Sequence, residues 1–213
     1  MKTVAIIQAR MGSTRLPGKV LMMLGDKTAL ERCIEQVQKS MVKDIVVATV
    51  VLKRDLPIVK LCASIGISVY CGSEQDVLDR YYQSAKLFEA DHIVRITADC
   101  PMLCPQTIDR VVQLHYDTGA DYTSNVIVRT FPNGHDVEIM TFAALERSYN
   151  LAVDPFEREH MDEYILRNQD KFNCKNLLND TDESRVRLTL DTQEDYEKLK
   201  RFYEKIPVFA RIY

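Results

Sequence analysis

The sequence predicts an α/β fold of three layers, with helices on both faces of a mostly parallel central sheet. Apolar runs rich in β-branched residues recur along the first half of the chain, and such runs are typical of strands buried on both faces. Helical patterns separate these runs, and strands that alternate with helices favour parallel pairing. No linker rich in Gly, Pro or Ser divides the chain, so we expect one domain over residues 1–213.

Each element of the first half is assigned from its own pattern. Thr28 and Glu31 fit a capping box at the start of one helix, and Pro105 suits the first turn of another. The apolar runs predict strands over residues 4–7, 45–51, 67–70 and 93–96. Further helices are predicted over residues 56–63 and 77–88.

The second half of the chain is less regular. Alternating polar and apolar residues predict strands over residues 136–140 and 186–190. Helices are expected over residues 141–151, 157–168 and 194–205. We expect residues from about 120 to 190 to complete the sheet and to form one wall of a cleft.

The composition excludes several classes of protein. The net charge of −3 and the mean hydropathy of −0.20 exclude a largely disordered chain and argue against one that coats nucleic acid or a membrane surface. No apolar run approaches the roughly 18 residues of a membrane-spanning helix, and the N-terminus lacks the pattern of a secretion signal. The six scattered cysteines are therefore expected to be free thiols in the cytoplasm.

The segment that follows the first predicted strand has the chemistry of a phosphate-binding loop. Residues 8–19 contain two glycines, which allow close backbone approach, together with two hydroxyls and three cations. These residues are Gly12 and Gly18, Ser13 and Thr14, and Arg10, Arg15 and Lys19. The spacing matches neither the Walker loop nor the dinucleotide fingerprint. The alternative is a solvated basic turn without a ligand.

Two aspartates are placed for a metal ion. Asp99 follows the predicted strand 93–96, and Asp191 follows the predicted strand 186–190, so both lie where the carboxyl ends of the strands meet the loop. Two carboxylates beside a polyphosphate can bind Mg²⁺. Either residue alone fits a helix N-cap equally well. Asp180 and Asp182 form a competing Asp-x-Asp motif, but their polar surroundings favour a turn.

Three more residues could contact a substrate. Asp136 and Glu138 share one face of a predicted strand, where they could hold sugar hydroxyls or point to solvent. His160 is predicted on a helix and could contact a substrate, although such histidines are more often on the surface. The apolar segment 206–213 could pack on a partner subunit or on the core of the same chain.

The motifs of this chain resemble those of a known family. Residues 6–21, IIQARMGSTRLPGKVL, are similar to the opening of the CMP-sugar synthetase (cytidylyltransferase) superfamily, and are closest to the branch of spore-coat polysaccharide biosynthesis protein F. Sialic-acid synthetases have Pro-Ala-Arg where this chain has Gln8-Ala9-Arg10. Further matching motifs are GSEQDVLDR (72–80), RITADCP (95–101), DYTSN (121–125), RTFPNGHDVE (129–138), REH (158–160) and RLTLDT (187–192).

The resemblance implies a nucleotide-diphospho-sugar transferase (Rossmann-like) fold, CTP and Mg²⁺ as ligands, and release of pyrophosphate. It implies that Arg10, Lys19 and Asp99 are catalytic and that Asp99 and Asp191 bind the metal. The residues implied to bind nucleotide are Ala9, Arg10, Gly12, Ser13, Arg15, Lys19, Asp79 and Arg80. Those implied to line the sugar side, with residues of about 120–190, are Asn125, Arg129, Asp136, Glu138 and His160.

The leading hypothesis is a nucleotidyltransferase that moves CMP from CTP to a sugar, with an acidic sugar favoured, for a surface polysaccharide. A glycosyltransferase that uses a nucleotide-sugar donor and a non-catalytic nucleotide-binding domain are the alternatives. The expected partners are CTP and a small sugar, without nucleic acid or membrane, and a homodimer is possible by family analogy.

Overall fold

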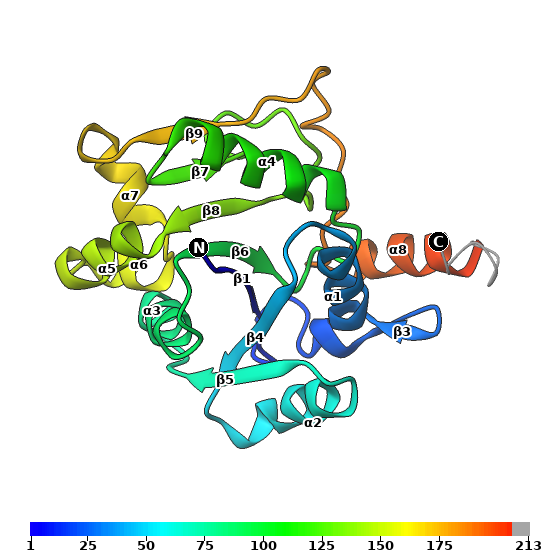
Figure 1. Cartoon of the computed structure of the whole chain (residues 1–213). Coiled ribbons are helices and arrows are strands. Elements are labelled where there is room, and N and C mark those ends of the chain that lie inside the picture. Colours follow the sequence, from blue (N-terminus) through cyan, green and yellow to red (C-terminus); the bar gives the residue numbers. More distant parts are fainter. Residues whose placement is uncertain (206–213) are drawn as a thin grey trace.

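The computed structural model describes residues 1–205. A seven-stranded sheet forms the centre of this part, in the order β5-β4-β1-β6-β8-β7-β9, and Figure 1 shows these strands stacked from β9 at the top to β5 near the bottom. The strands are β1 (Thr3–Gln8), β4 (Asp44–Val50), β5 (Ser68–Gly72), β6 (His92–Thr97), β7 (Tyr122–Ser124), β8 (Glu138–Thr141) and β9 (Cys174–Asn176).

Most of the sheet is parallel, as the apolar runs predicted. Strands β5, β4, β1 and β6 pair in parallel, β8 runs antiparallel to both β6 and β7, and β9 is parallel to β7. The four strands predicted in the first half are confirmed, because buried β-branched residues on both faces suit a sheet covered by helices. The sequence patterns missed β7, β9 and the small hairpin of β2 (Met23–Leu24) and β3 (Lys27–Thr28).

Helices cover both faces of the sheet, which confirms the three-layer prediction. Helices α1, α2 and α4 share one apolar core with the strands, and α3, α5 and α7 share the other. Figure 1 shows α1 to the right of the strands and α3 and α5 to the left. The helices are α1 (Ala29–Lys39), α2 (Leu56–Ser64), α3 (Val77–Leu87), α4 (Pro105–Thr118), α5 (Phe142–Leu151), α6 (Pro155–Glu159), α7 (Glu163–Arg167) and α8 (Gln193–Lys205).

Local signals set several helix ends correctly. The capping box of Thr28 and Glu31 is present at the start of α1, and Pro105 occupies the first turn of α4. Such caps use side chains or a missing N–H to satisfy donors that a helix end leaves free. The helices predicted over residues 56–63, 77–88, 141–151 and 194–205 are confirmed within one or two residues.

The continuous helix predicted over residues 157–168 is wrong. The chain leaves the helical conformation at His160, and α6 and α7 are separate helices. The interruption lets the Met161 side chain reach the core, where it is fully buried, and lets Asp162 accept a hydrogen bond from the hydroxyl of Tyr122 at 3.2 Å. Tertiary packing therefore overrides the local helical pattern.

Both strands predicted in the second half need correction. Strand β8 begins at Glu138 rather than Asp136, because the N–H of Val137 donates to the side chain of Asn125 instead of a neighbouring strand. Residues 186–190 form no strand, although one isolated bridge joins Asn133 to Arg187. The backbone of this segment bonds to loops, and those contacts place Asp191.

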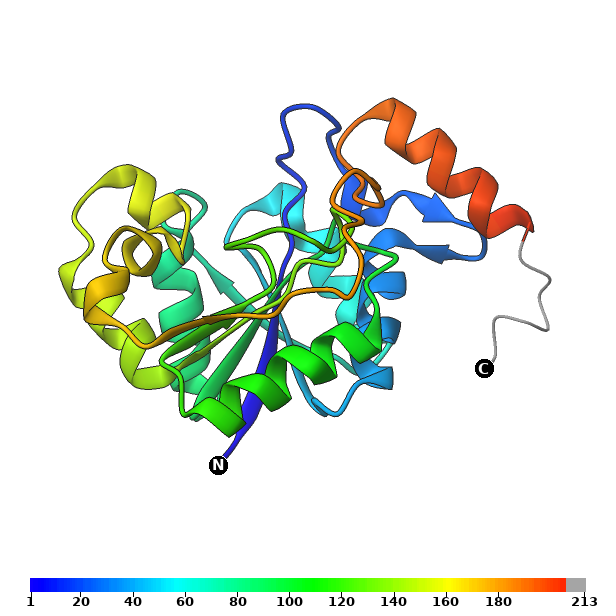
Figure 2. The same cartoon turned by 90° about the horizontal axis from the view of Figure 1, so that it is seen from above.

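The central strands end in polar residues at the same end of the sheet. Gln8, the last residue of β1, lies in register with Ala48 of β4 and Thr97 of β6. In Figure 2 the chain runs from the N-terminus along β1 to a loop at the opposite edge, near the segment that leads into α8. The loop after β1 and the residues after β6 therefore meet, as expected for carboxyl ends of parallel strands.

The segment 206–213, predicted to pack on a partner or on the core, lies outside the described residues. No helix within residues 1–205 combines the length and apolar character needed to cross a membrane.

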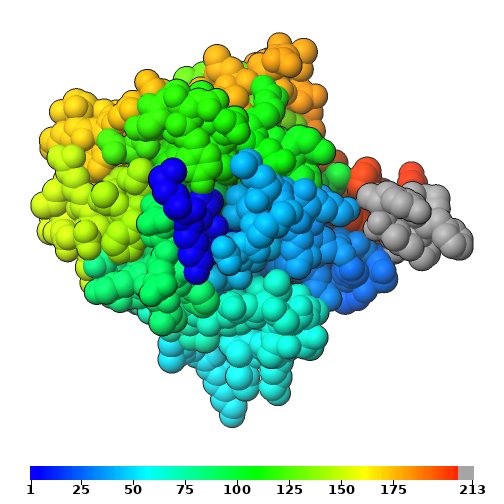
Figure 3. Space-filling model, in the orientation of Figure 1, coloured from blue at the N-terminus to red at the C-terminus, as the bar shows by residue number. Residues whose placement is uncertain are grey.

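The opposite end of the sheet, where the central strands begin, contains a pair of histidines, of which one is buried. His115 of α4 is 1% exposed, and its ring contacts His92 at 3.0 Å and the hydroxyl of Thr123 at 3.1 Å. Burial, together with the neighbouring His92, lowers the pKa of His115 to about 4. The first residues of the chain cover this end, and Figure 3 shows them on the surface in dark blue.

We predict that this pair makes the protein less stable in acid. Unfolding returns His115 to a pKa of about 6.5, so the unfolded chain binds a proton that the folded chain excludes, and stability falls as the pH drops from about 6.5 towards 4. Urea unfolding of wild type and His115→Gln at pH 7 and pH 4.5 measures this effect. The variant should lose about 2 kcal/mol less on acidification, and an identical loss in both proteins would contradict the prediction.

Candidate functional site

A two-lobed cavity opens at the carboxyl ends of β1 and β6. The main lobe has a volume of about 430 Å³ and the side lobe about 120 Å³. The main lobe is lined by Gln8, Arg10, Ser13, Thr14, Arg15, Lys19, Val20, Arg95, Thr97, Ala98, Asp99, His160 and Asp191. The side lobe is lined by Gln8, Ala9, Arg10, Val77, Arg80, Arg95, Glu159 and His160. Because four residues line both lobes, the two spaces are adjacent.

The loop after β1 is anchored on both sides. The N–H of Met11 donates to the buried carboxylate of Asp55 at 2.7 Å, and the N–H of Gly18 donates to the carbonyl of Met11 at 3.0 Å. Gly18 has a positive φ of 72°, which a residue with a Cβ rarely adopts. These contacts fold the loop back on itself and direct Lys19 into the cavity.

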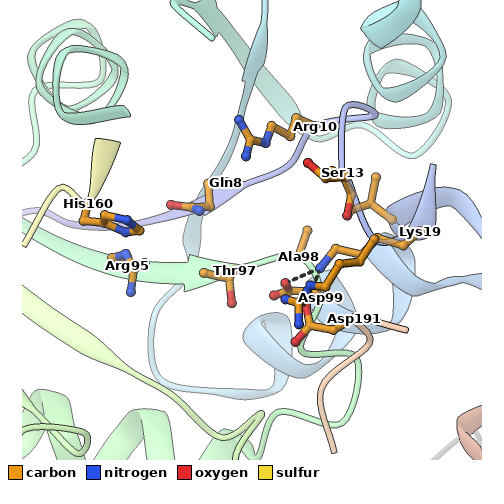
Figure 4. A pocket seen from close by; sticks show the side chains of 13 residues that line it. Gln8, Arg10, Ser13, Lys19, Arg95, Thr97, Ala98, Asp99, His160 and Asp191 are labelled. Atoms are coloured by element: carbon orange, nitrogen blue, oxygen red, sulfur yellow. Dashed lines mark hydrogen bonds and ion pairs between the residues drawn. The ribbon is translucent and has the colours of Figure 1, made fainter. Parts of the chain in front are cut away.

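Lys19 joins the two aspartates predicted to bind a metal. Its Nζ lies 2.6 Å from Oδ2 of Asp99 and 2.8 Å from Oδ1 of Asp191. Figure 4 shows these three side chains meeting at one end of the cavity, with Arg95 and His160 at the other end. Burial by itself lowers the pKa of Lys19, but the charges and hydrogen bonds of Asp99 and Asp191 outweigh it, so the pKa is raised overall.

A close approach between two loops positions Asp191. The N–H of Leu188 donates to the carbonyl of Asn133 at 2.7 Å, and the N–H of Leu190 donates to the carbonyl of Asp99 at 2.8 Å. A Cβ on Gly134, whose φ is 109°, would lie 2.8 Å from the backbone of Leu188. Glycine is therefore required where the two loops touch, and this contact brings Asp191 beside Asp99.

The side chain of Asp191 is oriented by cations rather than by a helix end. Arg15 and Arg187 each lie 3.0 Å from its carboxylate. Burial raises the pKa of Asp191, but Lys19 and the two arginines lower it more, so the net shift is downward. Thr192 and Asp195 exchange the hydrogen bonds that cap α8, so Asp191 is not the N-cap of that helix.

The donor set fits a hard divalent cation. Asp99 and Asp191 converge on one point, which the ammonium group of Lys19 contacts, and carboxylate oxygens are the ligands that Mg²⁺ prefers. Within residues 1–205 no cluster of three or more His, Cys, Asp or Glu side chains is arranged to hold a metal ion. A metal here would therefore complete its shell with phosphate oxygens and water, as is usual for Mg²⁺ at phosphate sites.

Three arginines line the side lobe, and within residues 1–205 two of them, Arg10 and Arg80, form no ion pair with a carboxylate. Arg80 is 2% exposed, and its Nη1 donates to the carbonyl of Ser73 at 2.6 Å. Burial, and the nearby charge of Arg10, lower the pKa of Arg80. A ligand with acceptor groups would relieve the repulsion between these two arginines.

Arg95 is a cavity residue that the sequence reasoning did not single out. It lies on β6, and its Nη1 donates to Oε1 of Glu138 on β8 at 2.8 Å. Glu138 is 3% exposed, so it does not point to solvent, and it lines neither lobe of the cavity. Burial raises the pKa of Glu138 to about 7 against the opposing charge of Arg95. A charged residue within an otherwise apolar strand was the sequence signal that could have identified Arg95 as a site residue.

The expected sugar-side residues do not all reach the cavity. Asn125 uses its amide to bond the carbonyl of His135 and the N–H of Val137, and Arg129 and Asp136 bond each other at 2.6 and 2.8 Å. None of the three lines either lobe, whereas His160 lines both. Their sugar contacts therefore remain predictions.

His160 reaches the cavity because an ion pair and hydrogen bonds hold α6 against the start of α3. Nε of Arg158 donates to Oδ2 of Asp76, the N-cap of α3, at 2.9 Å, and Nη1 of Arg158 donates to the carbonyl of Tyr149 at 2.8 Å. The ring of Tyr149 also stacks against this guanidinium. The REH motif thus closes the cavity wall from the side of α3.

Other predicted residues lie apart from the lobes. Gly12 and Asp79 line neither of them, although both adjoin residues that do. Asp180 and Asp182 are exposed, and Asp182 accepts a hydrogen bond from the N–H of Ser184. This is the turn that the sequence favoured over an Asp-x-Asp metal motif.

Comparison with solved structures shows a similar fold over nearly the whole chain. A cytidylyltransferase from Leptospira borgpetersenii superposes with a TM-score of 0.94 and 38% identity, over 99% of this chain and 90% of that chain. A CMP:2-keto-3-deoxy-manno-octonic acid synthetase complexed with CTP superposes with a TM-score of 0.72 and 18% identity, over 96% of this chain and 99% of that one. These likenesses confirm the expected Rossmann-like nucleotidyltransferase fold.

Sequence comparison agrees with the fold. The chain is 37% identical to the spore coat polysaccharide biosynthesis protein SpsF of Bacillus subtilis, over 94% of this chain and 85% of that protein. The family model described as cytidylyltransferase matches residues 4–211, which confirms the resemblance found in the motifs. The chain therefore belongs to the cytidylyltransferase family.

Proposed function

We propose that the protein transfers CMP from CTP to a sugar with an acidic group and releases pyrophosphate. The single observation that carries this proposal is the convergence of Asp99 and Asp191 on Lys19, beside a glycine-containing cationic loop. Such an arrangement supplies both a cation site and positive charge for a triphosphate. Family membership supports the same chemistry.

The reaction is an in-line displacement at the α-phosphate. A sugar hydroxyl oxygen forms a bond to the α-phosphorus while the bond to the oxygen that bridges to the β-phosphate breaks, so pyrophosphate leaves and the hydroxyl proton passes to solvent water. Arg10, Arg15 and Lys19 would hold the triphosphate and stabilise the charge that spreads over its oxygens. Mg²⁺, held by Asp99 and Asp191, would supply further positive charge at the reacting phosphate.

The choice of CTP and of an acidic sugar is supported by relatives. A structural neighbour is a synthetase of CMP-2-keto-3-deoxy-manno-octonic acid complexed with CTP, and the SpsF protein is named for polysaccharide biosynthesis. The cavity agrees, because Arg95 and His160 lie at the end opposite Lys19 and could receive an anionic substrate. Action in the cytoplasm, on a surface or spore-coat polysaccharide, and assembly as a homodimer remain predictions from the sequence.

The glycosyltransferase alternative has less support. It requires Asp180 and Asp182 at the metal, yet both are exposed and neither lines the cavity. No observation within residues 1–205 specifically favours a non-catalytic nucleotide-binding domain.

We predict that Lys19→Ala lowers the turnover number by about 100- to 1,000-fold, equivalent to about 2.7–4 kcal/mol, because a preorganised charge donor is lost. Pyrophosphate release with CTP, Mg²⁺ and candidate sugar acids provides the measurement. Lys60→Ala, at an exposed lysine outside both lobes, is the matched control and should retain wild-type turnover. Unchanged turnover in Lys19→Ala would remove Lys19 from the mechanism.

The metal assignment predicts opposite results at the two pairs of aspartates. Asp99→Asn and Asp191→Asn should each reduce pyrophosphate release by at least about 100-fold, because each removes one carboxylate charge from the cation site. The double variant Asp180→Asn/Asp182→Asn should retain activity, since these side chains only form a turn. The reverse pattern, with activity lost only in the double variant, would favour a glycosyltransferase.

Nucleotide binding alone should stabilise the fold. At one hundred times its dissociation constant, a ligand adds about 2.7 kcal/mol, or roughly 5–10 °C in the unfolding midpoint of a domain of this size. We predict such a shift with CTP and Mg²⁺, and smaller shifts with UTP, ATP or GTP, in thermal unfolding experiments. A larger shift with UTP or a UDP-sugar would instead support the glycosyltransferase.

A further inference from the structure

The backbone of the loop after β1 continues beyond the strand that guides it. The N–H of Ala9, just after β1, donates to the carbonyl of Ala48 on the neighbouring strand β4 at 3.1 Å. In an extended chain, N–H groups two residues apart point to the same side, so the N–H of Met11 also needs an acceptor on the side of β4. Strand β4 ends at Val50, whose carbonyl accepts from the N–H of Leu52 instead.

The side chain of Asp55 supplies the acceptor that β4 no longer provides. Its Oδ1 accepts from the N–H of Met11 at 2.7 Å, and the residue is fully buried. Asp55 is the N-cap residue of α2, yet its side chain accepts no hydrogen bond from that helix, as an aspartate at this position usually does. The carboxylate therefore serves the loop rather than its own helix.

The residue that follows Met11 is contacted from the same side. Arg54 forms an ion pair with Glu74 in the loop between β5 and α3, and its Nε lies 3.4 Å from Oδ2 of Asp55. A Cβ on Gly12 would lie 2.5 Å from Nη2 of Arg54 and 3.0 Å from Oε1 of Glu74. A glycine at this position lets the loop rest against the segment that carries Arg54 and Asp55.

These contacts act on the part of the loop that does not line the cavity. Arg10 and Ser13 both line the main lobe, whereas Met11 and Gly12 between them line neither lobe, and neither does Asp55. Because Met11 and Gly12 connect Arg10 to Ser13, the position of their backbone sets where both cavity side chains begin. Misplacing such groups by about 1 Å can cost as much as about 100-fold.

We propose that Asp55 is a positioning residue for the loop after β1. Through the N–H of Met11 it holds Arg10 and Ser13 where they bind the triphosphate, without touching the substrate itself. The inference rests on the proposed function, because it takes a nucleoside triphosphate as the ligand of this loop. A contact that only stabilised the fold would change the unfolding midpoint and leave the nucleotide affinity of the folded protein unaltered.

The test is calorimetric binding of CTP with Mg²⁺ to wild type and two variants of Asp55, each below its unfolding midpoint. Asp55→Leu is similar in size but lacks an acceptor, so it should weaken CTP binding roughly 10- to 100-fold. Asp55→Asn keeps an acceptor oxygen for the N–H of Met11 and should bind CTP within about threefold of wild type. Asp55→Ala, which adds no bulk, takes the place of Asp55→Leu if that variant does not fold.

Asp109→Leu is the matched control. Asp109 of α4 accepts a hydrogen bond from the N–H of Met41 at 2.6 Å, which is the same kind of contact, but neither residue lines the two lobes. This variant should bind CTP as tightly as wild type. A loss of affinity equal to that of Asp55→Leu would mean that any lost contact of this kind weakens binding, and would overturn the specific role of Asp55.

Hydrogen exchange of the free proteins follows the loop directly. The amide of Met11 should exchange at least about tenfold faster in Asp55→Leu than in wild type, because its acceptor is lost, and at the wild-type rate in Asp55→Asn. Wild-type affinity in Asp55→Leu, or an equal loss of affinity in Asp55→Asn, would overturn the role of Asp55, while CTP binding by wild type would still support the proposed function. Wild type that does not bind CTP would overturn both.

Discussion

The ion pairs of Lys19 with Asp99 and Asp191 are the constraint on which the site depends. Two carboxylates brought this close repel each other unless a cation lies between them, and Lys19 supplies that charge at 2.6 and 2.8 Å. Three elements must be in place for the contact to form: the anchored loop after β1, the turn after β6 and the segment before α8. Any cation bound by these two carboxylates would therefore depend on the geometry of the fold at this end of the sheet.

The charges are distributed unevenly along the cavity. At the end with Lys19, cations and carboxylates balance, and Arg187 and Asp195 pair at 2.8 Å behind Asp191. At the side lobe, Arg10 and Arg80 form no ion pair among the described residues, and Arg95 pairs with the buried Glu138. A ligand with phosphate groups and a cation at one end and hydrogen-bond acceptors at the other would match this distribution, and the nucleoside triphosphate of the proposed function is such a ligand.

Local patterns predicted the parts of the molecule that depend on local forces. The buried strands, the capping box at Thr28 and the cationic loop all follow from periodicity, side-chain capping or composition within a few residues. The position of Asp99 followed too, because a residue just after a parallel strand must lie at the edge where ligands bind. Failures occurred where distant contacts decide the conformation: Met161 enters the core and interrupts a helical pattern, and Asn125 displaces a strand partner from Val137.

The sequence by itself determined the fold class, the loop after β1 and the family to which the chain belongs. Only the tertiary structure decided which polar residues share the cavity. It brought Asp191 to Asp99 through the contact of Gly134 with Leu188. It also placed Gln8 and Arg95 at the side lobe, whereas Glu138 is buried and lines neither lobe. The physical reason is that periodicity and caps are properties of neighbouring residues, whereas the convergence of charged side chains depends on loops that meet only after the sheet has formed.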